Sequence, residues 1–114
     1  MEVRKLEKAE WGAFLEHLSK QFPAAQVEID IGPFTPGGNV QTNWASLLGL
    51  AYDPKDDLIE VAVEGLDHMI RQPREIYLEQ GEGSLASIEV IDAGGGRQMI
   101  KLKDALRLRP PGSK

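Results

Sequence analysis

The sequence predicts an α+β protein in which an amino-terminal helix packs on a bent antiparallel β-meander, or on a small Sm-like or SH3-like barrel, of five to seven strands. Three observations predict this class: one early stretch has helical periodicity, most of the remainder alternates with a period of two, and glycine- or proline-rich turns recur at roughly ten-residue spacing. The likeness to the barrels is one of element order. No second stretch is long enough for repeated β-α-β units, which excludes a doubly wound nucleotide-binding fold.

The helix is predicted over residues 8–21. Large apolar side chains there recur at the spacing of one helix face, at Trp11, Phe14, Leu15, Leu18 and Phe22. Glu10 in the first turn and Lys20 in the last carry the charges that the helix dipole favours, and Pro23 ends the helix. We expect burial of this stripe, rather than intrinsic propensity, to stabilise the helix.

The strands are predicted from alternation bounded by turn residues. The first, at 26–31, is the clearest, and two prolines with three glycines at 32–39 indicate a loop after it. The further strand segments are 40–44, 47–52, 58–63, 66–71, 74–79, 85–91 and 97–103. We expect one domain over 1–109 and a flexible tail at 110–114.

Composition excludes several classes of protein. The 114 residues include no cysteine, so disulfides, thiolate zinc sites, iron–sulfur clusters and a cysteine nucleophile are ruled out. The net charge is −5, and no window reaches the roughly 18 apolar residues that a membrane helix needs. The charged amino terminus resembles no signal peptide. We therefore expect a cytoplasmic protein that does not enter a membrane.

No catalytic motif is present. Neither G-x-S-x-G nor G-x-x-x-x-G-K-[ST] occurs, and Gly94–Gly96 stands between two predicted strands, as a hairpin turn does. Four acidic residues between 53 and 60 resemble a cation site, but they lack the register of an EF-hand loop. A solvated turn in which Asp53 accepts backbone hydrogen bonds is the preferred interpretation. We expect no enzyme activity, no cofactor and no metal.

Three residues are candidates for binding a protein partner: Phe34, Trp44 and His68. Phe34 stands in a loop that cannot bury it locally, so it either contacts a partner or folds back over the core. His68 shares a predicted strand face with Leu66 and Ile70, so it is either a histidine at the core edge with a satisfied hydrogen bond or a functional imidazole.

A second candidate is a basic surface near the carboxyl terminus. Residues 97–114 contain 6 basic and 1 acidic side chains, whereas residues 1–96 contain 7 basic and 17 acidic ones. The candidate anion-binding residues all have odd numbers and would share one strand face: Arg97, Lys101, Lys103, Arg107 and Arg109. They either protect an edge strand from aggregation or bind an anionic partner. The acidic remainder disfavours nucleic acid.

Several short motifs resemble a family of small uncharacterised bacterial proteins known only as a domain of unknown function. The motifs are Glu10-Trp11 with Phe14-Leu15 and Ser19-x-Gln21, Gly49-Leu-Ala-Tyr-Asp-Pro-Lys-Asp-Asp57 with Ile59-Glu-Val61, Asp67-His-Met-Ile70, Pro73-Arg-Glu-Ile76 and Gln98-Met-Ile100. The resemblance covers nearly the whole chain and implies a bacterial, single-domain protein without implying an activity.

These observations favour a non-catalytic binding or assembly module of a bacterial cytoplasm. Its expected partners are another protein or a second copy of the chain, because an open sheet presents an edge strand that can pair in a two-fold dimer. The alternative is a weak anion or nucleic-acid binder that uses the basic carboxy-terminal strand.

Overall fold

The structure is a computed structural model that describes residues 2–21, 25–32, 39–81 and 84–107. Side chains are described for these residues except at positions 21, 39–43 and 104–107. Phe34, Arg109 and the predicted tail at 110–114 lie outside the described residues.

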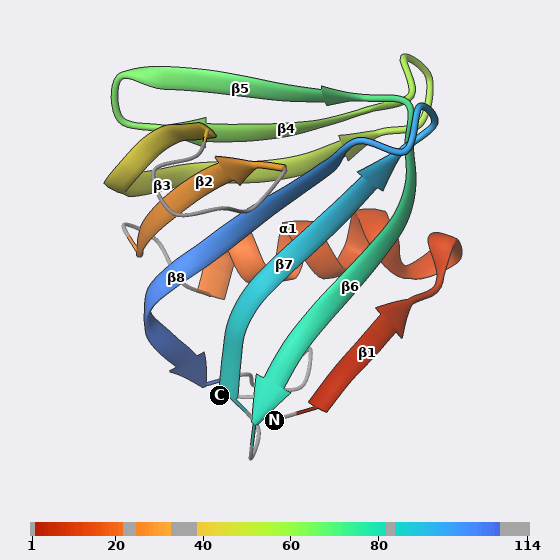
Figure 1. Cartoon of the computed structure of the whole chain (residues 1–114). Helices are drawn as coiled ribbons and strands as arrows, with labels where there is room; N and C mark the ends of the chain where they lie inside the picture. Colours follow the sequence, from red (N-terminus) through yellow and green to blue (C-terminus); the bar gives the residue numbers. More distant parts are fainter. Residues whose placement is uncertain (1, 22–24, 33–38, 82–83, 108–114) are drawn as a thin grey trace.

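One helix packs on one antiparallel sheet (Figure 1). The sheet has eight strands in the order β1-β6-β7-β8-β2-β3-β4-β5. In chain order the elements are β1 (Glu2–Leu6), the 3-10 helix η1 (Lys8–Glu10), α1 (Trp11–Gln21), β2 (Gln26–Ile31), β3 (Asn39–Asp53), β4 (Leu58–Val63), β5 (Leu66–Arg71), β6 (Pro73–Gly81), β7 (Ser84–Asp92) and β8 (Arg97–Arg107). The predicted α+β class is confirmed.

The sheet has more strands than predicted, and of the two predicted forms it is the open bent sheet rather than the barrel. It has eight strands rather than five to seven, because β1 was not predicted. Glu2, Arg4 and Lys5 of β1 are exposed and only Leu6 is buried, so this strand has no apolar alternation. The segments at 40–44 and 47–52 also form one long strand, β3. Among the described strands, β1 and β5 each have one neighbour, so the sheet is open and does not close as an Sm-like or SH3-like barrel would.

Helix α1 covers a section of β3 that β2 leaves unpaired. Strand β2 pairs with β3 only as far as Ser46, whereas β4 pairs with β3 from Leu47 to Asp53. The Ser19 hydroxyl of α1 accepts a hydrogen bond from the backbone amide of Leu50, 3.2 Å away. The helix therefore satisfies a donor that would otherwise be left without a partner at this strand edge.

Trp11 joins the helix to β1, at one end of the sheet, and to the interior strand β3. Its side chain is 1% exposed, and its indole N–H donates to the carbonyl of Leu6 in β1 at 3.1 Å. Its ring meets that of Tyr52 in β3 edge to face, with centroids 5.2 Å apart. Leu15 and Leu18 are also buried and Phe14 is half-buried, so the described part of the predicted apolar stripe is confirmed.

The strands bury alternate residues on the side that faces α1. Strand β4 shows this most clearly, with Ile59, Val61 and Val63 buried. The sheet is strongly bent, as predicted: His68 of β5 hydrogen-bonds to Gln98 of β8, although three strands separate β5 from β8. In Figure 1, α1 lies behind β6, β7 and β8. The buried side chains of α1 and of the strands thus form one hydrophobic core.

Trp11→Ala should lower the free energy of unfolding by about 3–5 kcal/mol, because it empties a fully buried site and leaves the Leu6 carbonyl without its donor. Val3→Ala is the matched control, since Val3 is 67% exposed, and it should change stability by less than about 0.5 kcal/mol. Urea denaturation measures both. Equal midpoints for the two variants would contradict the assigned role of Trp11.

Candidate functional site: the free edge of the sheet

Strand β5 forms one end of the sheet. A two-residue turn, Glu64-Gly65, joins it to β4, and Gly65 has φ +86°, which glycine adopts without strain. The antiparallel register runs from Val63 opposite Leu66 to Leu58 opposite Arg71. On its other side, β5 faces no strand among the described residues, and Figure 1 shows it as the uppermost strand.

The pairing fixes which backbone groups of β5 point away from the sheet. The amide of Gln72 donates to the carbonyl of Asp57, 2.8 Å away, which continues the β4–β5 ladder by one pair. In an antiparallel ladder, hydrogen-bonded and non-hydrogen-bonded pairs alternate. Asp67, Met69 and Arg71, the β5 edge residues, therefore direct their N–H and C=O groups toward the free edge, whereas His68 and Ile70 direct theirs toward β4.

The side chains of the β5 edge residues are exposed. Met69 is 38% exposed, which is unusual for a large apolar side chain in this chain. A hydrogen bond with Asp67, and the charge of Asp67, raise the pKa of the neighbouring Glu60 in β4. Arg71 forms no hydrogen bond or ion pair with any residue that the structure describes. A pair of carboxyl groups, Asp67 of β5 and Glu60 of β4, and the guanidinium of Arg71, which has no ion-pair partner among the described residues, thus stand at this end of the sheet.

His68 lies on the opposite, inner face of β5. It is opposite Val61 in the register and half-buried, and its ring Nε2 is hydrogen-bonded to the side-chain oxygen of Gln98. This environment favours the interpretation of His68 as a core-edge histidine with a satisfied hydrogen bond. Its role in binding a partner stays a prediction.

Trp44, another predicted partner-binding residue, lies elsewhere on the sheet. It is 37% exposed with φ +51°, a conformation that is strained for a bulky residue. It occupies an irregularity in the β2–β3 pairing, between Ala45 opposite Val27 and Thr42 opposite Ile29. Because β4 separates β3 from β5, Trp44 and His68 stand on strands that are not neighbours.

The basic residues of β8 do not form a surface of one sign. Strand β8 pairs with β7, and it pairs with β2 from Gln98 to Leu102. The amide of Gly32 also donates to the carbonyl of Arg97, so the interpretation as protection for an edge strand is wrong for Arg97 and Lys101. Lys101 lies 2.7 Å from Asp30 and 3.6 Å from Glu28, and the hydrogen bond to Asp30 is the largest cause that raises the pKa of Lys101.

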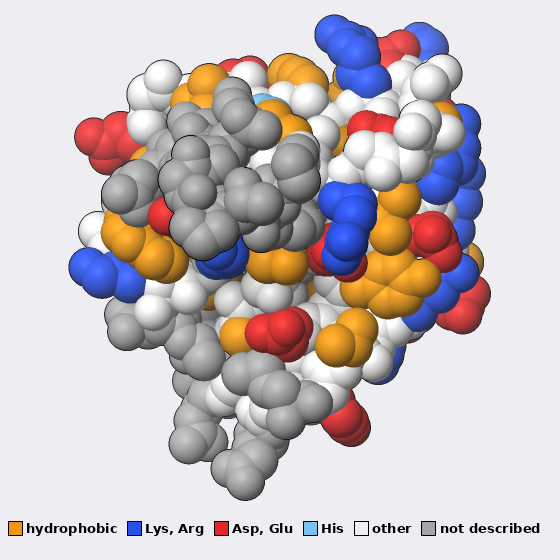
Figure 2. Space-filling view, in the orientation of Figure 1, with side chains coloured by type: hydrophobic (Ala, Val, Ile, Leu, Met, Phe, Trp, Pro, Cys, Tyr) orange, Lys and Arg blue, Asp and Glu red, His pale blue; other side chains and the backbone are white. Residues whose placement is uncertain are grey.

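Arg97 of β8 also faces a carboxylate. Both the Nε and the Nη2 of Arg97 donate to Glu89, at 3.1 and 2.5 Å. Figure 2 shows blue and red side chains interspersed over this face of the sheet. Lys103 is exposed. The side chain of Arg107 and the whole of Arg109 are not among the parts of the chain that the structure describes. Of the β8 cations whose side chains are described, Arg97 and Lys101 therefore face carboxylates, and Lys103 is the exception.

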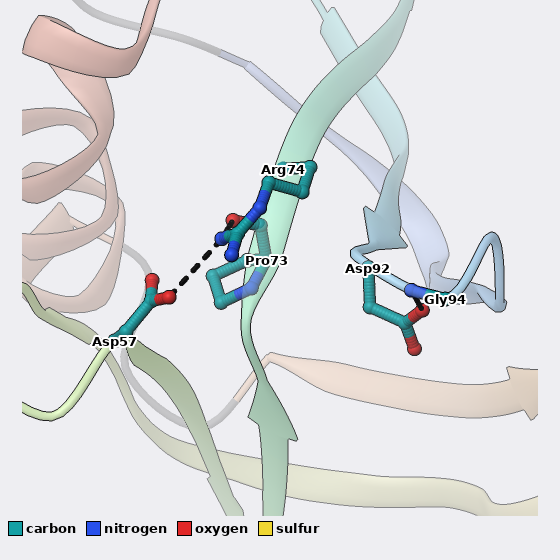
Figure 3. A network of polar contacts seen from close by, with 5 residues as sticks. All are labelled: Asp57, Pro73, Arg74, Asp92 and Gly94. Atoms are coloured by element: carbon teal, nitrogen blue, oxygen red, sulfur yellow. Dashed lines mark hydrogen bonds and ion pairs between the residues drawn. The ribbon is translucent and has the colours of Figure 1, made fainter.

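The acidic segment at 53–57 forms a turn, as expected. An Oδ1 atom of Asp53 accepts hydrogen bonds from the amides of Lys55 and Asp56 at 3.0 and 3.2 Å. Asp57 lies 3.1 Å from the guanidinium of Arg74 in β6 (Figure 3). No group of three or more potential metal ligands occurs among the described residues. These carboxylates fix turns and join strands.

The β7–β8 turn is held by Asp92. Its Oδ1 accepts hydrogen bonds from the amides of Gly94 and Gly96, each at 2.9 Å, and Figure 3 shows the first of these. Gly95 has φ +84°. The amide of Ala93 donates to the carbonyl of Gln72, so this turn is also tied to the start of β6. Gly94–Gly96 is thus a hairpin turn, as predicted.

Sequence reasoning did not select the β5 edge residues. Their signal is the alternation of an acidic, an apolar and a basic side chain within 66–71. That signal acquires meaning only when β5 is known to be an edge strand, which depends on the order of strands in the sheet.

The fold of the described residues is of the α+β class, with α-helix α1 packed on an open antiparallel sheet. The chain belongs to the family described as "Family of unknown function (DUF5335)", which matches residues 2–111. It is similar to an "Uncharacterized protein" of the bacterium Aquifex aeolicus (strain VF5), with 38% identity over 109 residues that cover 95% of this chain and 98% of the relative. No solved structure gives a significant match. The resemblance seen in the sequence is confirmed.

No helix in the described part of the chain is long and apolar enough to cross a membrane.

Gly96→Ala should destabilise the protein by roughly 1–3 kcal/mol, because the added methyl group would lie 2.7 Å from Oδ2 of Asp92. Gly12→Ala is the matched control. It lies in α1 with nothing within 4 Å of the added methyl group, so it should stabilise the protein by about 0.5–1 kcal/mol. Thermal unfolding should shift in opposite directions. A shift in the same direction would contradict the role of Asp92 in the turn.

Proposed function

We propose that this protein is a non-catalytic assembly module that adds an extended segment of another protein chain to its sheet at β5. The observation that carries the proposal is the free edge of β5, where the β5 edge residues present backbone donors and acceptors that no described strand pairs with. Strand addition of this kind obtains affinity from main-chain hydrogen bonds and specificity from the side chains of alternate residues.

The two edges of the sheet are not equivalent. At the β1 edge, Trp11 already donates to the Leu6 carbonyl, and α1 follows β1 directly. Each edge strand exposes an apolar side chain, Val3 on β1 and Met69 on β5, but only Met69 stands between an acidic and a basic residue on its own strand face, Asp67 and Arg71. Exposed edges are normally blunted in monomeric proteins, and an edge that retains an apolar residue is suited to pairing.

The bulge in β3 adds a second apolar group on the same half of the sheet. The β3–β4 register shifts between Leu47 and Gly49, and the intervening Leu48 is 67% exposed. Strands β3, β4 and β5 are consecutive neighbours, so a segment added at β5 would extend the half of the sheet that carries Leu48.

The alternative, binding of an anion by the basic strand, has less support. Lys101 and Arg97 already face Asp30, Glu28 and Glu89, so an incoming phosphate would have to compete with these carboxylates. Such competition reduces the counterion release on which binding of nucleic acid depends.

A library of extended peptides displayed on phage tests the proposal. Peptides selected on the natural chain should protect the amides of the β5 edge residues from hydrogen exchange, and they should not bind Met69→Pro. Proline removes the outward N–H of residue 69, and an edge strand accepts it there. Met69→Thr retains the N–H and should retain binding. Circular dichroism and thermal unfolding verify that each variant folds.

Failure to select any peptide would contradict the proposal. Selected peptides that bind Met69→Pro and the natural chain equally, or that leave the amides of residues 67, 69 and 71 unprotected, would also contradict it.

A further inference from the structure

We propose that the segment added at β5 is the β5 strand of a second copy of this chain, paired antiparallel about Met69 in a two-fold dimer. This inference rests on the proposed function of the β5 edge and names its partner. It follows from which residues of β5 direct their backbone N–H and C=O groups outward, from the charges of β5 and from the environment of Glu60.

The backbone groups of β5 specify one register. Antiparallel pairing about Met69 places Met69 opposite Met69 of the second copy, and Asp67 opposite Arg71. Each β5 edge residue then exchanges both of its outward hydrogen bonds with a partner that also points outward. A shift by two residues would leave one of the three residues outside the ladder, so the register centred on Met69 satisfies the most groups.

The charges of β5 are self-complementary in this same register. Residues directly opposite each other in an antiparallel pair have Cβ atoms about 4.5–5.5 Å apart, within reach of an ion pair. The two-fold axis therefore generates the Asp67–Arg71 pair twice. At the centre, two Met69 side chains, each 38% exposed in the single chain, meet across the axis.

Glu60 of the neighbouring strand β4 favours the presence of a cation beside Asp67. Asp67 and Glu60 share a hydrogen bond that raises the pKa of Glu60, so the single chain holds two carboxyl groups together without a compensating cation among the described residues. Arg71 of the second copy would lie beside Asp67. The same residue, Arg71, forms no ion pair within the described part of its own chain.

Two charge variants test the register. Asp67→Arg gives a β5 with Arg at both positions, and Arg71→Asp gives one with Asp at both. In either variant alone, like charges face each other twice, so self-association should weaken by roughly tenfold or more. When the two variants are mixed, every pair becomes complementary, so a heterodimer of about natural affinity should form.

Sedimentation velocity over a concentration series measures these dissociation constants. Arg4→Asp is the matched control, because it changes one charge on the opposite edge of the sheet, and it should leave self-association unchanged. The double variant Asp67→Arg with Arg71→Asp should associate with itself as the natural chain does. Thermal unfolding of each variant verifies the fold, and the mixing experiment reports on pairing even where a single variant is less stable.

A natural chain that stays monomeric up to about 1 mM would overturn this inference. So would single variants that self-associate as strongly as the natural chain, or a mixture that forms no heterodimer. If the natural chain is monomeric but selected peptides still protect the β5 edge amides, only the identity of the partner is wrong. If no peptide binds at β5 either, the proposed function fails as well.

Discussion

The packing of α1 against β3 is the contact on which the rest of the molecule depends. The helix covers the section of β3 that β2 leaves unpaired, and Ser19 satisfies the amide of Leu50 there. Trp11 adds contacts to β1 through Leu6 and to β3 through Tyr52. These contacts tie α1 to β1, at one end of the sheet, and to β3, whose β2 side beyond Ser46 the helix covers. The other side of β3 pairs with β4, and β4 pairs with β5, so the free edge lies at β5.

Charge on the outer face is balanced between strands rather than along them. Lys101 of β8 is opposite Glu28 of β2, and Lys5 of β1 lies 3.2 Å from Glu75 of β6. Exposed pairs of this kind contribute little stability individually. Because these cations already lie next to carboxylates, this face is poorly suited to anion binding. The outward backbone groups of β5, which no described strand pairs with, are the better candidate for a binding site.

The parts of the fold that could be predicted from the sequence are those with local periodicity. Strands β2, β4 and β5 have the predicted bounds, because their alternation and their turn residues are both local signals. Strand β1 was missed because a single buried residue, Leu6, gives no alternation. Strand β3 was predicted as two pieces because its period breaks where Trp44 adopts φ +51°.

The site could not be predicted, because it depends on strand order. The pairing of β8 with β2 joins residues about seventy positions apart in the sequence. This pairing makes Lys101 of β8 a partner of Asp30. The same order makes β5 an end of the sheet. A pattern such as Asp67, Met69 and Arg71 looks like an ordinary exposed strand face until its backbone is known to lack a neighbour.

Residue-resolved hydrogen exchange of β5 in the natural chain tests the central claim, pairing at β5, most directly. At low concentration, the amides of His68 and Ile70 should be protected and those of Asp67, Met69 and Arg71 should exchange rapidly. At high concentration, all five should be protected. Rapid exchange at residues 67, 69 and 71 at every concentration would contradict self-pairing at this edge, and protection of these amides at low concentration would contradict the free edge itself.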